Sequence, residues 1–350
     1  MPGPLPHREC ALRGALLGCA LGDAVGLPLE GLSPRRAQRF IGKRLHMRFL
    51  PGIGMVSDDT DHTIFVAQSL MVGDGDVSRF RRALAWRLRC WLLCLPAGIG
   101  LATLRAILRL WLGMSRSGVF SAGNGPAMRS AVIGAALAED AAARRAHVQA
   151  STELTHTDPR AFTGALALAE IAACLARGEW RGRPTTGALH DLLAGLSPEA
   201  EWQQVVTDLT RFAAHPDPHA AAARFGRRGG ISGYVYHSVP FAILAWYWHY
   251  GDFRATLECV ARAGGDVDTV GAMAGALAGV VTGEDGLPRD WLDGLIDWPH
   301  GRACLRALAA GLADPARSAP TAFSPWLFPR GLLFMLLVLL HGFRRLLPPY

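Results

Sequence analysis

Two short acidic segments contain the residues best able to do chemistry. Residues 57–60 read Ser-Asp-Asp-Thr, and residues 266–269 read Asp-Val-Asp-Thr directly after a Gly-Gly pair. Each segment stands where a loop enters an apolar stretch that we expect to be helical. The free N–H groups and partial positive charge of a helix start keep carboxylates ionised. Each segment therefore presents hydroxyl and carboxylate oxygens at one rigid point.

Brought together, the two segments would supply four carboxylates and several hydroxyls. Oxygen ligands without cysteine suit hard cations such as Mg²⁺ or Mn²⁺. Four carboxylates would neutralise two divalent ions, and such a pair can orient a substrate and activate a water. The competing interpretation is that Asp and Ser only cap two helices. Two acidic clusters in one chain leave these interpretations evenly balanced.

The elements that must position these segments are expected to be helices. The chain has 350 residues, half of them hydrophobic, and it is rich in glycine. Apolar residues recur at helical spacing, and no alternating strand pattern is present. The sequence therefore predicts an all-α fold, with one domain over residues 8–320. A Pro-rich linker and an apolar helix are expected over residues 321–350.

Charge and cysteine usage exclude several classes of protein. The net charge is +7, and the densest basic stretch, residues 35–48, is interpreted as a solvated face or as a surface that attracts an anionic substrate. No nucleic-acid-binding motif surrounds it, so no nucleic-acid partner is expected. The seven cysteines are odd in number and irregularly spaced. Free thiols in a reducing compartment fit best, which predicts a cytoplasmic protein.

The apolar C-terminal stretch raises the question of a membrane span. A span needs about 18 apolar residues, and the nearest candidate, residues 331–340, ends at His341. We therefore expect no transmembrane segment. The stretch is interpreted as a helix docked on the protein, with membrane contact as the alternative.

Five motifs, in their order and spacing, resemble those of the ADP-ribosylglycohydrolases over about residues 11–285. They read GALLGCALGDAVGLPLE, SDDT, GNGPAMR, LTHTDPRAFTGALALA and GGDVDTVGAMAGALAG. The resemblance implies a single compact orthogonal helical bundle and a magnesium-dependent hydrolase. We expect the protein to be a monomer.

The resemblance also implies roles for individual residues. Two Mg²⁺ ions, or Mn²⁺, would be held by Ser57, Asp58, Asp59, Asp266, Asp268 and Thr269. Asp59 and Glu30 would orient or deprotonate the attacking water. Substrate would be bound by Gly123, Asn124, Gly125, Met128, His156, Gly264 and Gly265. Helix starts near residues 123 and 264 would receive the diphosphate through backbone N–H groups. Ser57 departs from the commoner threonine but keeps the oxygen.

The reaction implied is hydrolysis of the glycosidic bond between C1″ of the distal ribose of ADP-ribose and an acceptor, either a protein side chain or a small molecule. Two alternatives remain. One is a catalytically inactive relative that binds ADP-ribose or resembles a crystallin; the other is a dinuclear-metal hydrolase of another substrate. Asn124 could also serve only as a turn residue, and His156 only as a helix-start histidine. Whether the acceptor is arginine, serine, nucleic acid or a metabolite is open.

Overall fold

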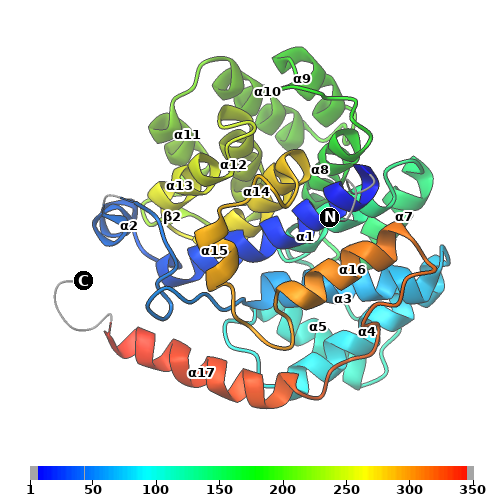
Figure 1. Cartoon of the computed structure of the whole chain (residues 1–350). Coiled ribbons are helices and arrows are strands. Elements are labelled where there is room, and N and C mark those ends of the chain that lie inside the picture. Colours follow the sequence, from blue (N-terminus) through cyan, green and yellow to red (C-terminus); the bar gives the residue numbers. More distant parts are fainter. Residues whose placement is uncertain (1–6, 43, 345–350) are drawn as a thin grey trace.

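The computed structural model describes residues 7–42 and 44–344, and most of these residues lie in helices (Figure 1). The predicted all-α class is confirmed. The α-helices are α1 (His7–Gly26), α2 (Pro34–Ile41), α3 (Asp58–Gly73), α4 (Val77–Leu93), α5 (Leu101–Trp111), α6 (Ala131–Ala136), α7 (Ala141–Glu153), α8 (Pro159–Ala176), α9 (Thr186–Ala194), α10 (Ala200–Ala214), α11 (Pro218–Arg224), α12 (Val235–Trp248), α13 (Phe253–Ala263), α14 (Val267–Thr282), α15 (Arg289–Gly294), α16 (Arg302–Ala313) and α17 (Leu327–Arg344).

Short irregular elements connect these helices. Two 3₁₀ turns, η1 (Leu27–Leu29) and η2 (Ala127–Arg129), follow α1 and precede α6. Strands β1 (Gly226–Arg227) and β2 (Gly230–Ile231) form one antiparallel ribbon, with Gly226 opposite Ile231. The ribbon is too short to alter the fold class. Lys43, within the basic stretch, lies outside the described residues.

Helices α1 and α14 are packed backbone to backbone at the centre of the molecule (Figure 1). A methyl group added at Gly14, Gly18 or Gly22 would lie only 1.8–2.2 Å from a backbone oxygen of α14. The facing residues are Gly279, Gly275 and Gly271, so both helices place glycine at every fourth position on the contacting face. Residues without a side chain are required for this close approach. It brings the end of α1 beside the start of α14, where Asp268 lies.

Helix α17 lies along the lower edge of the molecule (Figure 1) and is fixed at its first turns by a buried ion-pair network. The Arg330 guanidinium pairs with Asp297 at 2.6 Å and with Asp61 at 3.4 Å. Asp61 also accepts a hydrogen bond of 2.9 Å from Trp91 and lies 2.6 Å from His300 Nδ1. Asp61, the third acidic residue of the stretch that begins at Ser57, therefore belongs to this network.

Three helices are long and apolar enough to cross a membrane by length and composition: α1 extended through η1, α8, and α17. The expectation that no stretch reaches that length was therefore wrong. The first two lie inside the protein, with 89% and 78% of their apolar windows buried, whereas only 17% is buried in α17. Helix α17 also continues past His341 to Arg344. The division of the chain at residue 320 stays a prediction.

Candidate functional site

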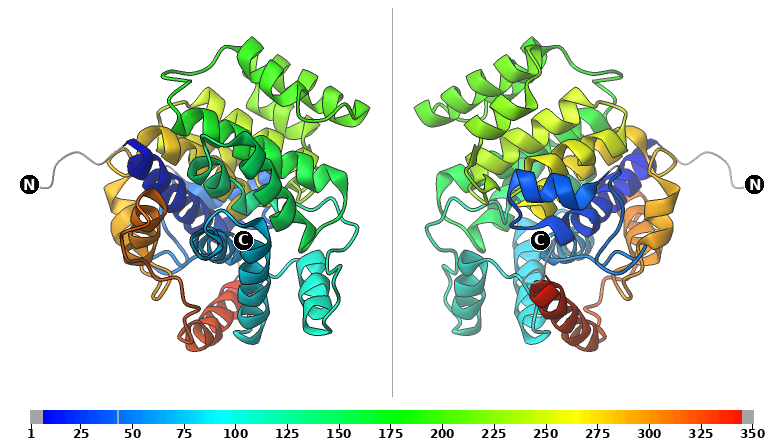
Figure 2. Two further views of the ribbon diagram at one scale, coloured as in Figure 1. Left: turned by 90° about the vertical axis from the view of Figure 1, so that its right-hand side faces the viewer. Right: turned by 90° about the vertical axis from the view of Figure 1, so that its left-hand side faces the viewer.

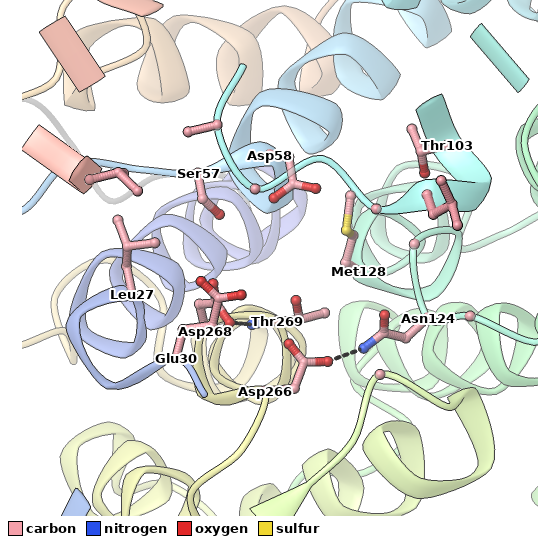
Figure 3. A pocket seen from close by; sticks show the side chains of 18 of the residues that line it. Leu27, Glu30, Ser57, Asp58, Thr103, Asn124, Met128, Asp266, Asp268 and Thr269 are labelled. Atoms are coloured by element: carbon pink, nitrogen blue, oxygen red, sulfur yellow. Dashed lines mark hydrogen bonds between the residues drawn. The ribbon is translucent and has the colours of Figure 1, made fainter. Parts of the chain in front are cut away.

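A pocket of about 470 Å³ lies where the starts of α3 and α14 meet (Figure 3). Loop residues 121–125 and one face of α17 complete its wall. Figure 3 shows Ser57 and Asp58 on one side of the pocket, and Glu30, Asp266 and Asp268 on the other. The two acidic segments identified in the sequence therefore converge on one cavity.

The first acidic segment is held by the end of α1. Ser57 is the N-cap of α3, and its hydroxyl lies 3.2 Å from Asp59 Oδ2, to which it donates. The buried carboxylate of Asp23 accepts a hydrogen bond from the Ser57 N–H at 2.9 Å and another from the Thr60 hydroxyl at 2.6 Å. Asp23 thereby fixes the first turn of α3 against α1.

The second acidic segment is joined directly to the first. The Thr269 hydroxyl donates a hydrogen bond of 3.3 Å to Asp59 Oδ2. The Thr269 N–H donates to Asp268 Oδ1 at 3.0 Å, which holds that carboxylate at the first turn of α14. Asp59 is completely buried and is not among the residues that line the pocket.

The Gly-Asn-Gly loop is tied to the same cluster. Asn124 Nδ2 donates a hydrogen bond of 2.7 Å to Asp266 Oδ2, drawn as a dashed line in Figure 3. The Asn124 N–H donates to the carbonyl of Gly233, and the Asn124 carbonyl accepts from the N–H of Met128. Asn124 is thus both a turn residue and a pocket residue, so the two interpretations left open by the sequence are compatible.

Burial and mutual repulsion make the ionised form of these carboxyls costly. Burial, followed by the charges of neighbouring carboxylates, raises the pKa values of Asp58, Asp59 and Asp268 well above the ordinary aspartate range. Burial also raises the pKa of Asp266, although hydrogen bonds from Asn124 and Thr269 oppose that rise. Asp59 Oδ1 is buried and has no hydrogen-bond partner among residues 7–42 and 44–344. Buried Arg129 interacts electrostatically with Asp58 in this cluster.

The donor chemistry fits a hard divalent cation, because an unpartnered buried oxygen and several crowded carboxyls are what such an ion would satisfy. In the described arrangement of residues 7–42 and 44–344, no three His, Cys, Asp or Glu side chains converge closely enough to hold an ion as they stand. Binding would therefore require these side chains to reorient around the ion.

His156 lines the pocket as a neutral imidazole. Its Nδ1 lies 2.9 Å from the hydroxyl of Thr155, and a methyl at Gly123 would lie 3.0 Å from its Nε2. Burial and then the charge of Arg129 lower the pKa of His156 to about 3. Buried Arg129 is held by Ser151 and by the Thr155 hydroxyl. This ring supports the Gly-Asn-Gly loop and accepts or donates hydrogen bonds without carrying a charge.

The structure places most of the predicted site residues in the pocket wall. The lining includes Glu30, Ser57, Asp58, Gly123, Asn124, Gly125, Met128, His156, Asp266, Asp268 and Thr269. Asp59, Gly264 and Gly265 do not line it.

The N–H groups of Gly265, Asp266 and Val267 already donate to backbone carbonyls, so these three cannot receive a diphosphate as predicted. Gly264 and Gly265, with φ of +66° and +84°, instead fasten the Glu30 turn to β2.

Sequence reasoning missed part of the wall. The stretch 97–103, Ser121 and Gly233 contribute to it, and so does the inner face of α17. Phe334, Val338 and His341 of α17 lie at helical spacing. This spacing predicts a helix docked on the protein, but it does not indicate that the helix lines the pocket. Phe334 packs with Leu27 and Phe49, so α17 forms one apolar side of an otherwise acidic pocket.

Residues 5–321 match the sequence model of the family described as ADP-ribosylglycohydrolase. An uncharacterised protein of Archaeoglobus fulgidus is 30% identical over 322 residues, which cover 87% of this chain and 97% of that protein. The ADP-ribosyl-[dinitrogen reductase] glycohydrolase of Rhodospirillum rubrum is 29% identical over 308 residues, covering 84% of this chain and 92% of the relative.

The chain is also similar to an ADP-ribosylarginine hydrolase and to a solved structure. The ADP-ribosylarginine hydrolase Tri1 of Pseudomonas putida is 30% identical over 344 residues, covering 90% of this chain and 83% of the relative. A solved structure titled ADP-ribosylglycohydrolase-related protein complex superposes with a TM-score of 0.67 at 27% identity, over 88% of this chain and 98% of that one. This superposition confirms the predicted fold type. The family match ends at residue 321, before α17 begins.

Proposed function

Because the chain belongs to the ADP-ribosylglycohydrolase family, we propose that it hydrolyses the glycosidic bond between C1″ of the distal ribose of ADP-ribose and an acceptor, with Mg²⁺ held in the acidic pocket. The observation that carries the proposal is the convergence of two acidic helix starts on one cavity, joined by the Thr269–Asp59 hydrogen bond. The cavity volume of about 470 Å³ lies in the range of pockets that bind small molecules and cofactors.

The metal ligands proposed are the oxygen atoms of the two helix starts. The set comprises Ser57, Asp58, Asp59, Asp266, Asp268 and Thr269. A bound Mg²⁺ would supply positive charge that orients ribose hydroxyls and lowers the pKa of a water. Burial and neighbouring carboxylates raise the pKa values of Asp59 and Asp268. A bound Mg²⁺ would lower them again and keep these carboxyls ionised.

The two candidates for handling the water proton differ in position. Glu30 is exposed and lines the pocket, where its charge raises the pKa values of Asp58 and Asp268. Asp59 is completely buried and contacts Ser57 and Thr269. We therefore assign proton transfer to Glu30 and a ligand and positioning role to Asp59. Bond cleavage through an oxocarbenium-like state requires a carboxylate near the reacting carbon, as in other glycoside hydrolysis.

For the acceptor we propose an arginine side chain. A guanidinium carries a positive charge, and the exposed carboxylate of Glu30 lines the pocket. A neutral serine O-glycoside would gain nothing from that charge. The relatives named ADP-ribosylarginine hydrolase, from Pseudomonas putida and Serratia proteamaculans, support the same choice.

The linkage is tested by measuring release of free ADP-ribose from matched arginine-linked, serine-linked and O-acetyl conjugates at saturating Mg²⁺. We expect the arginine-linked conjugate to be hydrolysed fastest. Faster hydrolysis of the serine-linked conjugate would overturn the acceptor assignment and leave the reaction intact. No release from any conjugate, by a folded protein that binds Mg²⁺, would overturn the proposed reaction.

A further inference from the structure

The outward face of α17 is a continuous apolar stripe. Leu336, Leu340 and Phe343 are 54%, 55% and 66% exposed, and Leu332 and Leu339 lie on the same side at helical spacing. The opposite face is the one that packs on the protein through Leu327, Arg330 and Phe334. An exposed apolar stripe of this length on a helix that is firmly held marks an interaction surface.

Other exposed apolar side chains gather at the same end of the molecule. Figure 2 shows α4, α5 and α17 together forming the lower end in both views. Gly331 of α17 packs on the backbone of Cys94, which follows α4. Leu93, Leu95 and Leu101 beside that contact are 58%, 50% and 60% exposed. The apolar surface therefore extends from α17 across the loop between α4 and α5.

This end of the molecule is basic and contains no acidic residue in the elements that form it. No Asp or Glu occurs in residues 77–138, which include α4 and α5, or in residues 315–350, which include α17. Arg105 is exposed and lies between Leu101 and Leu108 on the outer side of α5. Apolar side chains interleaved with arginine, without carboxylates, match the interface of a bilayer that carries anionic lipids.

Tryptophan marks the boundary of the surface. Trp326, directly before α17, and Trp298 are 57% and 62% exposed, and their ring centroids lie 5.2 Å apart. Exposed tryptophan is enriched at the level of lipid headgroups, where an apolar ring and a polar N–H are both accommodated. The pair stands where a helix lying in the interface would begin.

We propose that α17 and the α4–α5 loop form a docking surface for an anionic phospholipid bilayer, with α17 lying in the plane of the interface. The buried network of Arg330, Asp61 and Asp297 holds the helix on the protein, which argues for surface contact rather than for insertion across the bilayer. The inner face of α17 lines the pocket, so docking would place the pocket mouth beside the lipid surface.

A second copy of the chain is a poorer occupant of this surface. A two-fold interface places the same patch on both subunits, so each charge must meet a complementary one on its partner. Here arginines would face arginines, because these elements supply no carboxylate. An anionic bilayer provides both the apolar layer and the negative charge.

The test is co-flotation of the full chain with vesicles of phosphatidylcholine, with and without phosphatidylserine, at low and high salt. The variant L336D/L340D places two charges on the outward face of α17. Val72→Asp is the matched control, because Val72 is 45% exposed and lies at the other end of the α3–α4 hairpin from Leu93. Arg105→Glu tests the charge separately. Thermal unfolding of each variant shows that it is folded.

We expect the wild type and V72D to float with phosphatidylserine vesicles. Binding should weaken at least about 10-fold in L336D/L340D and weaken in R105E and at high salt, since buried apolar side chains and arginines near an anionic surface both contribute to binding. Equal flotation of all variants, or none by the wild type, would overturn the proposal. So would resistance to alkaline carbonate extraction, which indicates a spanning helix, or a dimer that L336D/L340D abolishes in the absence of lipid binding.

Discussion

The hydroxyl of Thr269 donates a hydrogen bond of 3.3 Å to Asp59, and this contact joins two acidic segments 210 residues apart in the chain. It is possible because α1 and α14 cross backbone to backbone, which brings Asp23 and Asp268 to the same end of the helix pair. The site therefore depends on the glycine face of two helices as much as on its own carboxylates.

Asp268→Asn should abolish most activity while making the metal-free protein more stable. The carboxyl lines the pocket, so its loss should lower the rate of ADP-ribose release by about 100-fold or more, since even residues behind metal ligands cost 10–100-fold. Stability should rise because burial and neighbouring carboxylates raise the pKa of Asp268.

The measurements are steady-state hydrolysis and the melting temperature in chelator. Asp191→Asn, at a carboxyl that is 85% exposed, is the matched control and should change neither. An Asp268→Asn protein that keeps full activity would contradict its assignment as a metal ligand.

The stability of the metal-free protein should depend on pH through Asp23. Burial raises the pKa of Asp23 to about 7 from an ordinary value of 3.8, although hydrogen bonds from Thr60 and Ser57 limit the rise. A carboxyl with a raised folded-state pKa contributes stability that is complete below its unfolded pKa and is lost as pH rises through the folded pKa. The contribution of Asp23 should therefore decrease between pH 4 and pH 7.

The measurement is the free energy of urea unfolding across this range, for the wild type and Asp23→Asn, in chelator. The stability advantage of the wild type over the variant should shrink as pH rises. An advantage that grows toward neutral pH would show that Asp23 is ionised in the folded protein and that the assignment of its pKa is wrong.

Arg330→Ala should destabilise the protein by about 3 kcal/mol, because it breaks the buried ion pair with Asp297 and removes one of the groups that stabilise ionised Asp61. Burial by itself would raise the pKa of Asp61, but the charges of Arg330 and His300 outweigh it and hold the pKa at about 2. The ion pairs thus favour the ionised form of Asp61.

Arg302→Ala is the control for Arg330→Ala, since Arg302 pairs with Asp293 at the surface, where the carboxylate is 76% exposed. Its cost should stay below about 1 kcal/mol. If both variants lowered the free energy of urea unfolding equally, the buried network would not be what holds α17 in place.

Gly18→Ala should destabilise the protein by about 1–3 kcal/mol or more, because the added methyl would lie 2.2 Å from the carbonyl oxygen of Gly275 and the helices would have to separate. Separation should also shift Asp23 relative to Asp268 and lower activity at saturating Mg²⁺. Gly182→Ala, where a methyl meets no atom within 4 Å, is the control in the same unfolding and activity assays. Normal activity in Gly18→Ala would show that the close contact between α1 and α14 is not needed to position the site residues.

The sequence was sufficient to predict the two acidic segments of the site and the all-α class. Ser57, Asp58, Asp266 and Asp268 could be placed in one site because the SDDT and GGDVDT segments resemble motifs of a known family, and the structure brings them to one pocket. The all-α class followed from apolar spacing.

Other features depend on contacts between distant segments. The role of Asp61 is set by Arg330, 269 residues later, and nothing near Asp61 in the sequence indicates it. Gly264 and Gly265 looked like a phosphate-binding turn, yet the N–H groups of Gly265 and Asp266 donate to the carbonyls of Leu32 and Ile231. The inner face of α17 reaches the pocket only because α17 folds back across it, beyond the end of the family match.

The measurement that tests the central claim most directly is the rate of ADP-ribose release from an arginine-linked conjugate, followed as Mg²⁺ is titrated into chelator-treated wild-type protein. The crowded carboxyls and the unpartnered Asp59 Oδ1 predict a rate that is negligible in chelator and saturates with Mg²⁺. Undiminished release in chelator would contradict the claim that the two acidic helix starts act by holding a divalent cation.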